Sequence, residues 1–198
     1  MAAGAVQLAC RAALEELERR GGSGEVDVER IYRHTRTEPL DPETGQVTGE
    51  RAHVALAVAA MRVVVEVDVD LGLTRVVWIG TAQDVGKAVN PLAVLGQVEG
   101  GTAQGLGLAL MEELQTREGR IVNASFTDYL IPTFLDMPPL DVELIEEAEP
   151  DAPYGVMGVG EPPTVVSTAA IASALRAATD RALTRVPVSP DELAGLDA

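Results

Sequence analysis

Residues 62–70 read Arg62-Val63-Val64-Val65-Glu66-Val67-Asp68-Val69-Asp70, so that valines at every second position share one face and mostly charged side chains share the other. This alternation is typical of a β-strand with one buried and one solvated face. The apolar stretch that leads into it starts at residue 53. Leu71-Gly72 then supplies a turn, and residues 74–79 are mostly apolar again, which predicts a second strand and a hairpin.

Three segments have the character of helices, and small residues are frequent in them. Residues 5–20 and 97–114 carry apolar side chains at helical spacing, and residues 164–183 are rich in alanine. The apolar stripe of the middle segment is formed by Leu106, Leu110 and Leu114. Several glycines interrupt that segment, and each costs a helix about 1 kcal/mol against alanine. We therefore expect this helix to pack closely against another backbone or a ligand.

The remaining segments complete the expected fold. Residues 35–51 and 81–96 are expected to be loops, and residues 121–131 and 140–147 are expected to be strands. These patterns predict an α+β fold in which antiparallel hairpins pack on glycine- and alanine-rich helices. The polar residues 188–198 are expected to form a loosely ordered tail.

The composition fits one globular domain or two small ones, and it limits the partners. At 198 residues the chain can bury a core, and 46% of its residues are hydrophobic. Its formal net charge of -16 argues against nucleic acid and against anionic membrane surfaces as partners. No stretch reaches the roughly 18 apolar residues of a membrane span. Residues 1–20 also lack the pattern of a secretory signal.

The reactive side chains are few and scattered. Cys10 is the single cysteine, which excludes an internal disulfide and a thiolate metal site and favours a reducing cytoplasm. His34 and His53 are too few and too isolated for a zinc site. The serines lack the G-x-S-x-G context of a nucleophile. Six glutamates of the second half of the chain read as solvated faces, namely Glu99, Glu112, Glu113, Glu146, Glu147 and Glu149.

One carboxylate stands in a distinctive setting, because residues 158–163 read Gly158-Val159-Gly160-Glu161-Pro162-Pro163. Proline disfavours helical backbone in the residue before it, so Glu161 is expected to be extended and its carboxylate aimed by the backbone. A catalytic base needs such fixed placement. An ordinary turn explains the same residues, and on local grounds both interpretations stay open.

A second glycine-rich motif surrounds Gln97. It reads Gly96-Gln97-Val98-Glu99-Gly100-Gly101, followed by Gln104-Gly105-Leu106-Gly107. It matches neither a P-loop, which ends in G-K-[ST], nor a dinucleotide fingerprint, which needs a strand directly before it. Gln97 is expected at the start of the helix, where its amide and free backbone N–H groups attract oxygen-rich ligands. A purely structural packing helix accounts for the same glycines.

Four motifs, taken in chain order, resemble the C-terminal part of the molybdenum-cofactor subunit of the xanthine dehydrogenase (molybdenum hydroxylase) family, and bacterial xanthine dehydrogenase in particular. They are Asp84-Val85-Gly86 with Asn90-Pro91, the motif around Gln97, Asp128-Tyr129-Leu130-Ile131-Pro132-Thr133, and the motif around Glu161. The resemblance extends upstream through residues 36–41 and 66–70 and covers nearly the whole chain. Without it, residues 84–91 read as a structured loop.

The resemblance implies a site and a reaction. Residues 1–198 would be the C-terminal molybdopterin-binding domain, with Glu161 as general base and Gln97, Gly96 and Gly160 lining molybdopterin or its cytosine dinucleotide. The pterin dithiolene, not a side chain of this chain, would hold the molybdenum. The reaction would be hydroxylation of a small molecule with oxygen taken from water. The substrate would be a purine such as xanthine or hypoxanthine, a related N-heterocycle, or an aldehyde.

The resemblance also implies partners. 2Fe-2S clusters and FAD would lie on partner chains or domains, and the remainder of the molybdenum subunit would be needed for activity. Exposed apolar surface is then expected around residues 97–114, where that remainder binds. One departure is Met157, which stands where the family usually has lysine. Two alternatives stay open: a non-catalytic subunit that completes another cofactor-bearing chain, and a stand-alone acidic hydrolase that uses Glu161 and another acid.

Overall fold

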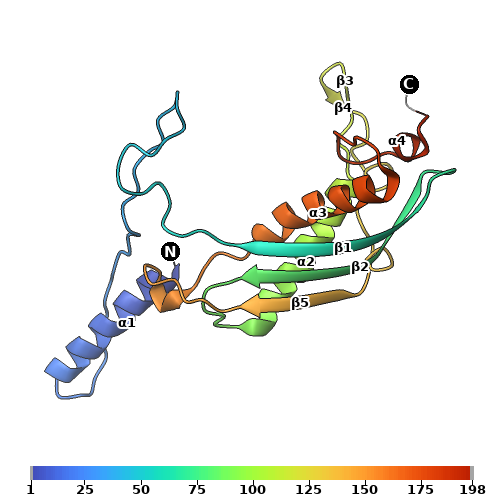
Figure 1. The fold of residues 1–198 in the computed structure, drawn as a ribbon. Coiled ribbons are helices and arrows are strands. Elements are labelled where there is room, and N and C mark those ends of the chain that lie inside the picture. The colour runs from blue at the N-terminus through green and yellow to red at the C-terminus, as the bar shows by residue number, and fades with distance from the viewer. Residues whose placement is uncertain (1, 197–198) are drawn as a thin grey trace. The chain divides into compact units, whose positions relative to one another are not determined.

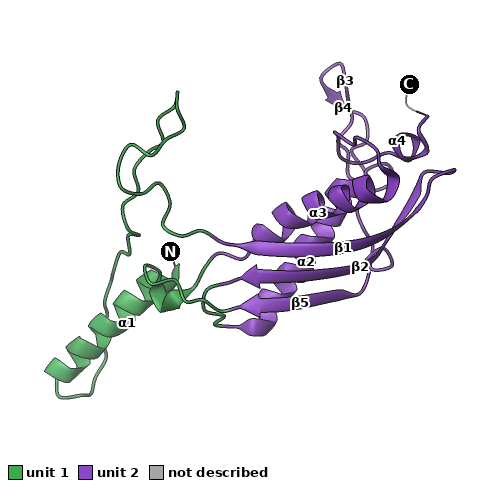
Figure 2. Cartoon of the chain, viewed as in Figure 1, with its two compact units in different colours: residues 1–56, 86–89, 146–157 green, residues 57–85, 90–145, 158–198 purple. Residues whose placement is uncertain are grey.

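The computed structural model describes residues 2–196. The chain divides into two compact units, coloured separately in Figure 2. Unit 1 comprises residues 1–56, 86–89 and 146–157, and unit 2 comprises residues 57–85, 90–145 and 158–198. None of the described helices is long and apolar enough to cross a membrane.

Unit 1 is built from helix α1 (Ala2–Arg19), a single 3-10 turn η1 (Pro153–Gly155) and irregular chain. Helix α1 confirms the helix predicted for residues 5–20. The loop predicted at residues 35–51 is confirmed as well, with one isolated bridge between Leu40 and Val47. The Asp41 carboxylate accepts the backbone N–H of Thr44 at 2.7 Å, which stabilises the turn inside this loop.

Unit 2 is built on a three-stranded sheet with the order β1-β2-β5, shown in Figure 1. Strands β1 (Ala59–Asp68) and β2 (Leu73–Asp84) pair antiparallel, which confirms the predicted hairpin. Strand β5 (Leu140–Ile145) pairs parallel to β2, so it is a strand as predicted but belongs to no second hairpin. The α+β fold class is confirmed, with this one parallel pair added to it.

The strand predicted over residues 121–131 is wrong. Only its first residue pairs, in the two-residue strands β3 (Thr116–Arg117) and β4 (Arg120–Ile121). The following residues turn around Ser125, whose carbonyl accepts the backbone N–H of Asp128 at 3.0 Å and of Tyr129 at 2.8 Å. Such local hydrogen bonds offer the backbone an alternative to a sheet, and here they prevail over the β-forming residues.

Two long helices, α2 (Pro91–Leu110) and α3 (Pro162–Thr179), cover one face of this sheet (Figure 1). Helix α2 begins six residues before the predicted start at residue 97, and β2 runs on to Asp84, so the predicted loop at residues 81–96 is much shorter. The reason is a cap that favours an early start: the Asn90 side chain accepts the N–H of Ala93 at 3.1 Å, and Pro91 occupies the first helical position.

The core lies between the sheet and these helices, and its fully buried members include Ile79, Leu106, Ile171 and Leu175. The segment expected to be a loose tail, described as far as residue 196, contributes two residues to it. Val188 and Leu193 are buried, and Leu193 lies in the short helix α4 (Pro190–Ala194), which a capping box of Ser189 and Glu192 starts. Two apolar side chains thus hold a stretch that is polar on average, while residues 197–198 lie outside the described part.

Candidate active site

Glycines let α2 and α3 approach each other closely. A Cβ added at Gly101 would lie 2.8 Å from the Cβ of Pro163, and one added at Gly105 would overlap the hydroxyl of Ser167. Side chains at these two positions would therefore push the helices apart. The close packing predicted for the glycine-rich helix is confirmed at Gly101 and Gly105, with α3 as the partner.

Two threonine hydroxyls fix how these helices are aligned. Thr164 Oγ1 donates to the carbonyl of Gly101 at 3.0 Å, and Thr168 Oγ1 donates to the carbonyl of Gly105 at 3.1 Å. Both pairs are 63 residues apart, so α2 and α3 run parallel with a constant offset. Gln97 lies one helical turn before Gly101 on α2, and Glu161 lies three residues before Thr164, at the start of α3. The fold thus brings the glutamine and the glutamate motifs to one end of the helix pair.

Glu161 is the N-cap residue of α3, and its side chain is exposed. Its backbone is helical, with φ -97° and ψ -37°, so the extended conformation predicted from Pro162 is wrong. The carbonyl of Glu161 accepts the N–H of Thr164 at 3.0 Å and of Val165 at 3.2 Å, and these bonds outweigh the steric preference. The Glu161 carboxylate caps no N–H of the described helix, so it is not committed to holding α3 together.

Gln97 lies in the second turn of α2 and not at its start, as was predicted. Its backbone N–H is therefore inside the helix, and only its exposed side-chain amide faces outward. The neighbouring Gly96 and Gly100, and Gly160 before α3, differ from the packing glycines. Apart from the adjoining residues and the backbone of α2 itself, a Cβ added at any of the three would meet no described atom within 4 Å, so packing within this chain does not require glycine there.

In the motifs at residues 84–91 and 128–133, polar side chains form hydrogen bonds within the chain. Lys87 donates to the Glu146 carboxylate at 2.7 Å, and this bond, with a second from the N–H of Ala88, lowers the pKa of Glu146. Tyr129 donates its hydroxyl to Glu112 at 2.7 Å, which raises the pKa of Tyr129 because the bond favours the protonated phenol. The interpretation of residues 84–91 as a structured loop therefore holds at Lys87 and Ala88.

The apolar surface lies elsewhere than predicted. Around residues 97–114 most large apolar side chains are buried or half-buried, whereas residues 121–135 expose a set of them, hereafter the apolar loop surface. Phe126, Phe134 and Leu135 are 82%, 92% and 90% exposed. The remaining members are Ile121, Val122, Leu130 and Ile131. Sequence reasoning missed this surface in part because residues 121–131 were assigned to a strand.

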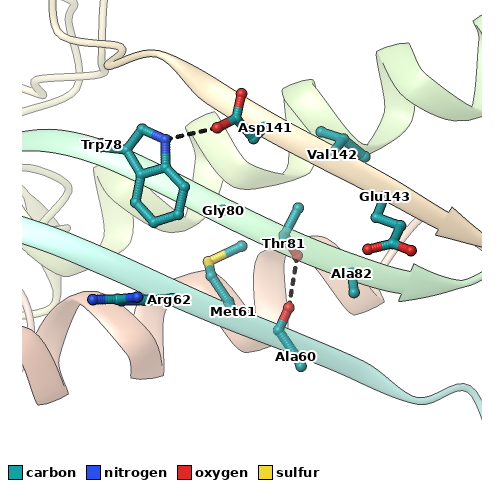
Figure 3. A pocket seen from close by; sticks show the side chains of 10 residues that line it. All are labelled: Ala60, Met61, Arg62, Trp78, Gly80, Thr81, Ala82, Asp141, Val142 and Glu143. Atoms are coloured by element: carbon teal, nitrogen blue, oxygen red, sulfur yellow. Dashed lines mark hydrogen bonds between the residues drawn. The ribbon is translucent and has the colours of Figure 1, made fainter.

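A shallow pocket opens on the sheet face opposite α2 and α3, hereafter the open face (Figure 3). Three of its lining side chains bond within the chain: Trp78 Nε1 donates to Asp141 at 2.9 Å, and Thr81 Oγ1 donates to the carbonyl of Ala60 at 3.0 Å. Within residues 2–196, no group of three or more His, Cys, Asp or Glu side chains is placed to hold a metal ion. A metal at Glu161 would thus need ligands from outside these residues.

Comparison with known proteins identifies the family. A family model described as molybdopterin cofactor-binding domain matches residues 1–138. The chain is 38% identical over 133 residues to the xanthine dehydrogenase molybdenum-binding subunit of Escherichia coli O157:H7, covering 65% of this chain and 18% of that protein. It is 30% identical over 212 aligned residues to the aldehyde oxidoreductase of Megalodesulfovibrio gigas, covering 98% of this chain and 22% of that protein.

The solved structures agree with these relatives. Aldehyde oxidoreductase from Desulfovibrio gigas matches with a TM-score of 0.70 and 33% identity, over 78% of this chain and 16% of that one. The chain thus spans about a fifth of the length of these relatives. The resemblance inferred from four short motifs is confirmed: this chain belongs to the molybdenum hydroxylase family of oxidoreductases, in its molybdopterin cofactor-binding part.

Proposed function

We propose that this chain supplies the general base, Glu161, and one wall of the cofactor site of a molybdenum hydroxylase. The substrate class is a purine such as xanthine or hypoxanthine, a related N-heterocycle, or an aldehyde. The observation that carries the proposal is the alignment of α2 and α3, in which Thr164, three residues after the exposed Glu161, bonds to Gly101, one turn after Gln97.

The residues at this end of the helix pair fit a molybdenum–pterin cofactor, either molybdopterin or its cytosine dinucleotide. Gly96, Gly100 and Gly160 leave room that no described atom fills, so a flat ring system can approach the backbone there. The Gln97 amide offers two donors and an acceptor to the polar edge of such a ring. When bound, the cofactor supplies the two-electron redox chemistry and activates the water-derived oxygen.

The role of Glu161 follows from its surroundings. Its carboxylate is exposed, caps no backbone N–H of α3, and is anchored by a backbone that Pro162 and Pro163 restrict. One Oε atom accepts the proton released as oxygen is transferred to the substrate, which is general-base catalysis. Gln97 orients the cofactor relative to that atom, so positioning and proton transfer come from adjacent helix ends.

Replacing Gln97 by alanine is expected to lower molybdenum retention or turnover about 2- to 10-fold, since one hydrogen bond contributes about 0.5–1.5 kcal/mol. The measurement is metal content per chain and kcat of the assembled enzyme. Gln46→Ala, in the exposed loop of unit 1, is the matched control and should change neither. Wild-type molybdenum content and turnover in Gln97→Ala would remove Gln97 from the site.

The proposal includes partners, because the chain spans only about a fifth of its relatives. We assign the remainder of the molybdenum subunit to the apolar loop surface, where Phe134 and Leu135 are almost fully exposed. Electrons leave through 2Fe-2S clusters and FAD on partner chains or domains. The lone cysteine supports a reducing compartment, the cytoplasm, for the complex.

The double replacement Phe134→Ser with Leu135→Ser is expected to weaken assembly with that remainder at least about tenfold, because buried aromatic anchors dominate interface energies. Co-purification and a titration of the two parts measure it. Leu71→Ser, an exposed residue of the β1–β2 turn, serves as the control and should assemble normally. Normal assembly of the double variant would show that the apolar loop surface is not the interface.

A further inference from the structure

Thr164 links the proposed base to the neighbouring helix. Its backbone N–H donates to the carbonyl of Glu161 at 3.0 Å, while its hydroxyl donates to the carbonyl of Gly101 on α2. That hydroxyl also lies 3.3 Å from Oε1 of Gln104, so its single hydrogen has two acceptors on the same helix. One residue therefore holds the start of α3 and the middle of α2 together.

These hydrogen bonds act beside a close packing of the two helices. Helices normally lock by inserting side chains into the grooves of the partner. At Gly101 and Gly105, α2 offers no side chain, and small side chains of α3 pack there instead, as Ser167 does at Gly105. Hydrogen bonds from Thr164 and Thr168 to the glycine carbonyls add a directional constraint on the alignment. Packed helices can shift past each other by about 1–2 Å when their contacts allow it.

We propose that Thr164 is a positioning residue. Its hydroxyl fixes how far α3 is shifted along α2, and so sets the position of Glu161 relative to Gln97. This inference rests on the proposed role of Glu161. Thr168 makes the corresponding bond one turn further from Glu161, and its Oγ1 also lies 3.3 Å from the Thr164 carbonyl within its own helix. Its loss leaves the Thr164 bond in place, so Thr168 matters less for the position of the carboxylate.

The test uses the assembled enzyme with three variants. Thr164→Val keeps the shape but removes the donor, Thr164→Ser keeps the donor, and Thr168→Val removes the equivalent bond one turn away. We expect Thr164→Val to lower kcat about 10- to 100-fold with KM and molybdenum content unchanged, because a displacement of about 1 Å can cost that much. Thr164→Ser should retain most of the activity, and Thr168→Val should lose less than about threefold.

A readout independent of turnover is amide hydrogen exchange. Residues 160–166 should take up deuterium faster in Thr164→Val than in wild type, and much less so in Thr168→Val, because the first turn of α3 loses its tie to α2. Equal exchange in Thr164→Val and wild type, or equal kcat losses in Thr164→Val and Thr168→Val, would overturn the inference. A fall in kcat of Thr164→Val that is fully explained by a lower molybdenum content would also overturn it.

Glu161→Gln separates this inference from the proposed function. If Glu161→Gln is inactive and Thr164→Val is fully active, only the positioning role of Thr164 fails. If Glu161→Gln turns over normally, the general-base assignment fails, and the positioning role with it. Adding Thr164→Val to Glu161→Gln should cause little further loss of kcat, because both changes act through one group.

Discussion

Replacing Glu161 by glutamine in the assembled enzyme is expected to lower turnover at least about 10²-fold while molybdenum content stays the same. Glutamine has the shape of glutamate but cannot accept a proton at neutral pH. We expect the variant to fold normally, because the Glu161 side chain caps no N–H of the described α3 and the two hydrogen bonds of its carbonyl remain. The measurement is kcat together with metal content per chain.

The matched control for this variant is Glu143→Gln. Glu143 is exposed on the open face of the sheet, opposite α2 and α3, so its replacement changes the net charge by the same amount at a distant place. We expect wild-type turnover from Glu143→Gln. Wild-type turnover from Glu161→Gln would instead exclude Glu161 as the base and favour a non-catalytic role for this chain.

Replacing Gly105 by alanine is expected to lower the free energy of unfolding by about 1–3 kcal/mol. The added Cβ would overlap the hydroxyl of Ser167, which is fully buried, so the two helices would have to separate. Gly100→Ala in the same helix should do the opposite. Nothing described lies within 4 Å of that Cβ, and alanine favours a helix over glycine by about 0.5–1 kcal/mol.

Urea unfolding of the two alanine variants measures both changes in the free energy of unfolding, which should have opposite signs. The comparison separates the packing glycines from those that face outward. If Gly105→Ala and Gly100→Ala change the free energy of unfolding equally, the close α2–α3 contact does not exist as described.

The sheet was predictable where its signal is local. The alternation along residues 62–70 is visible in the local sequence and predicted a strand. The turn directly after it then predicted the hairpin of β1 and β2. The parallel pairing of β5 with β2 joins Leu140 to Ile79, across an intervening helix, and no local pattern records such a pairing. The false strand at residues 121–131 arose because β-forming residues and turn-forming Ser125 compete, and the turn prevails.

The motifs name the proposed site residues, but they did not predict where the fold places them. The Asn90-Pro91 pair signals a helix start as well as a turn, and taking it as a turn displaced the start of α2 and hence the place of Gln97. The separation of Gln97 and Glu161 depends on the alignment of two helices. A signal for it exists in the sequence: hydroxyl residues Thr164 and Thr168 repeat at the same four-residue spacing as Gly101 and Gly105.

The position of molybdenum relative to Glu161 tests the central claim most directly. Anomalous X-ray scattering at the molybdenum edge, on crystals of the assembled enzyme, locates the metal without assumptions about the protein. We predict a peak beside Gln97 and the first turn of α3, with the Glu161 carboxylate within hydrogen-bond reach, about 3 Å, of the cofactor or substrate. A peak at the open face near Trp78 and Asp141, or anywhere out of reach of Glu161, would contradict the account.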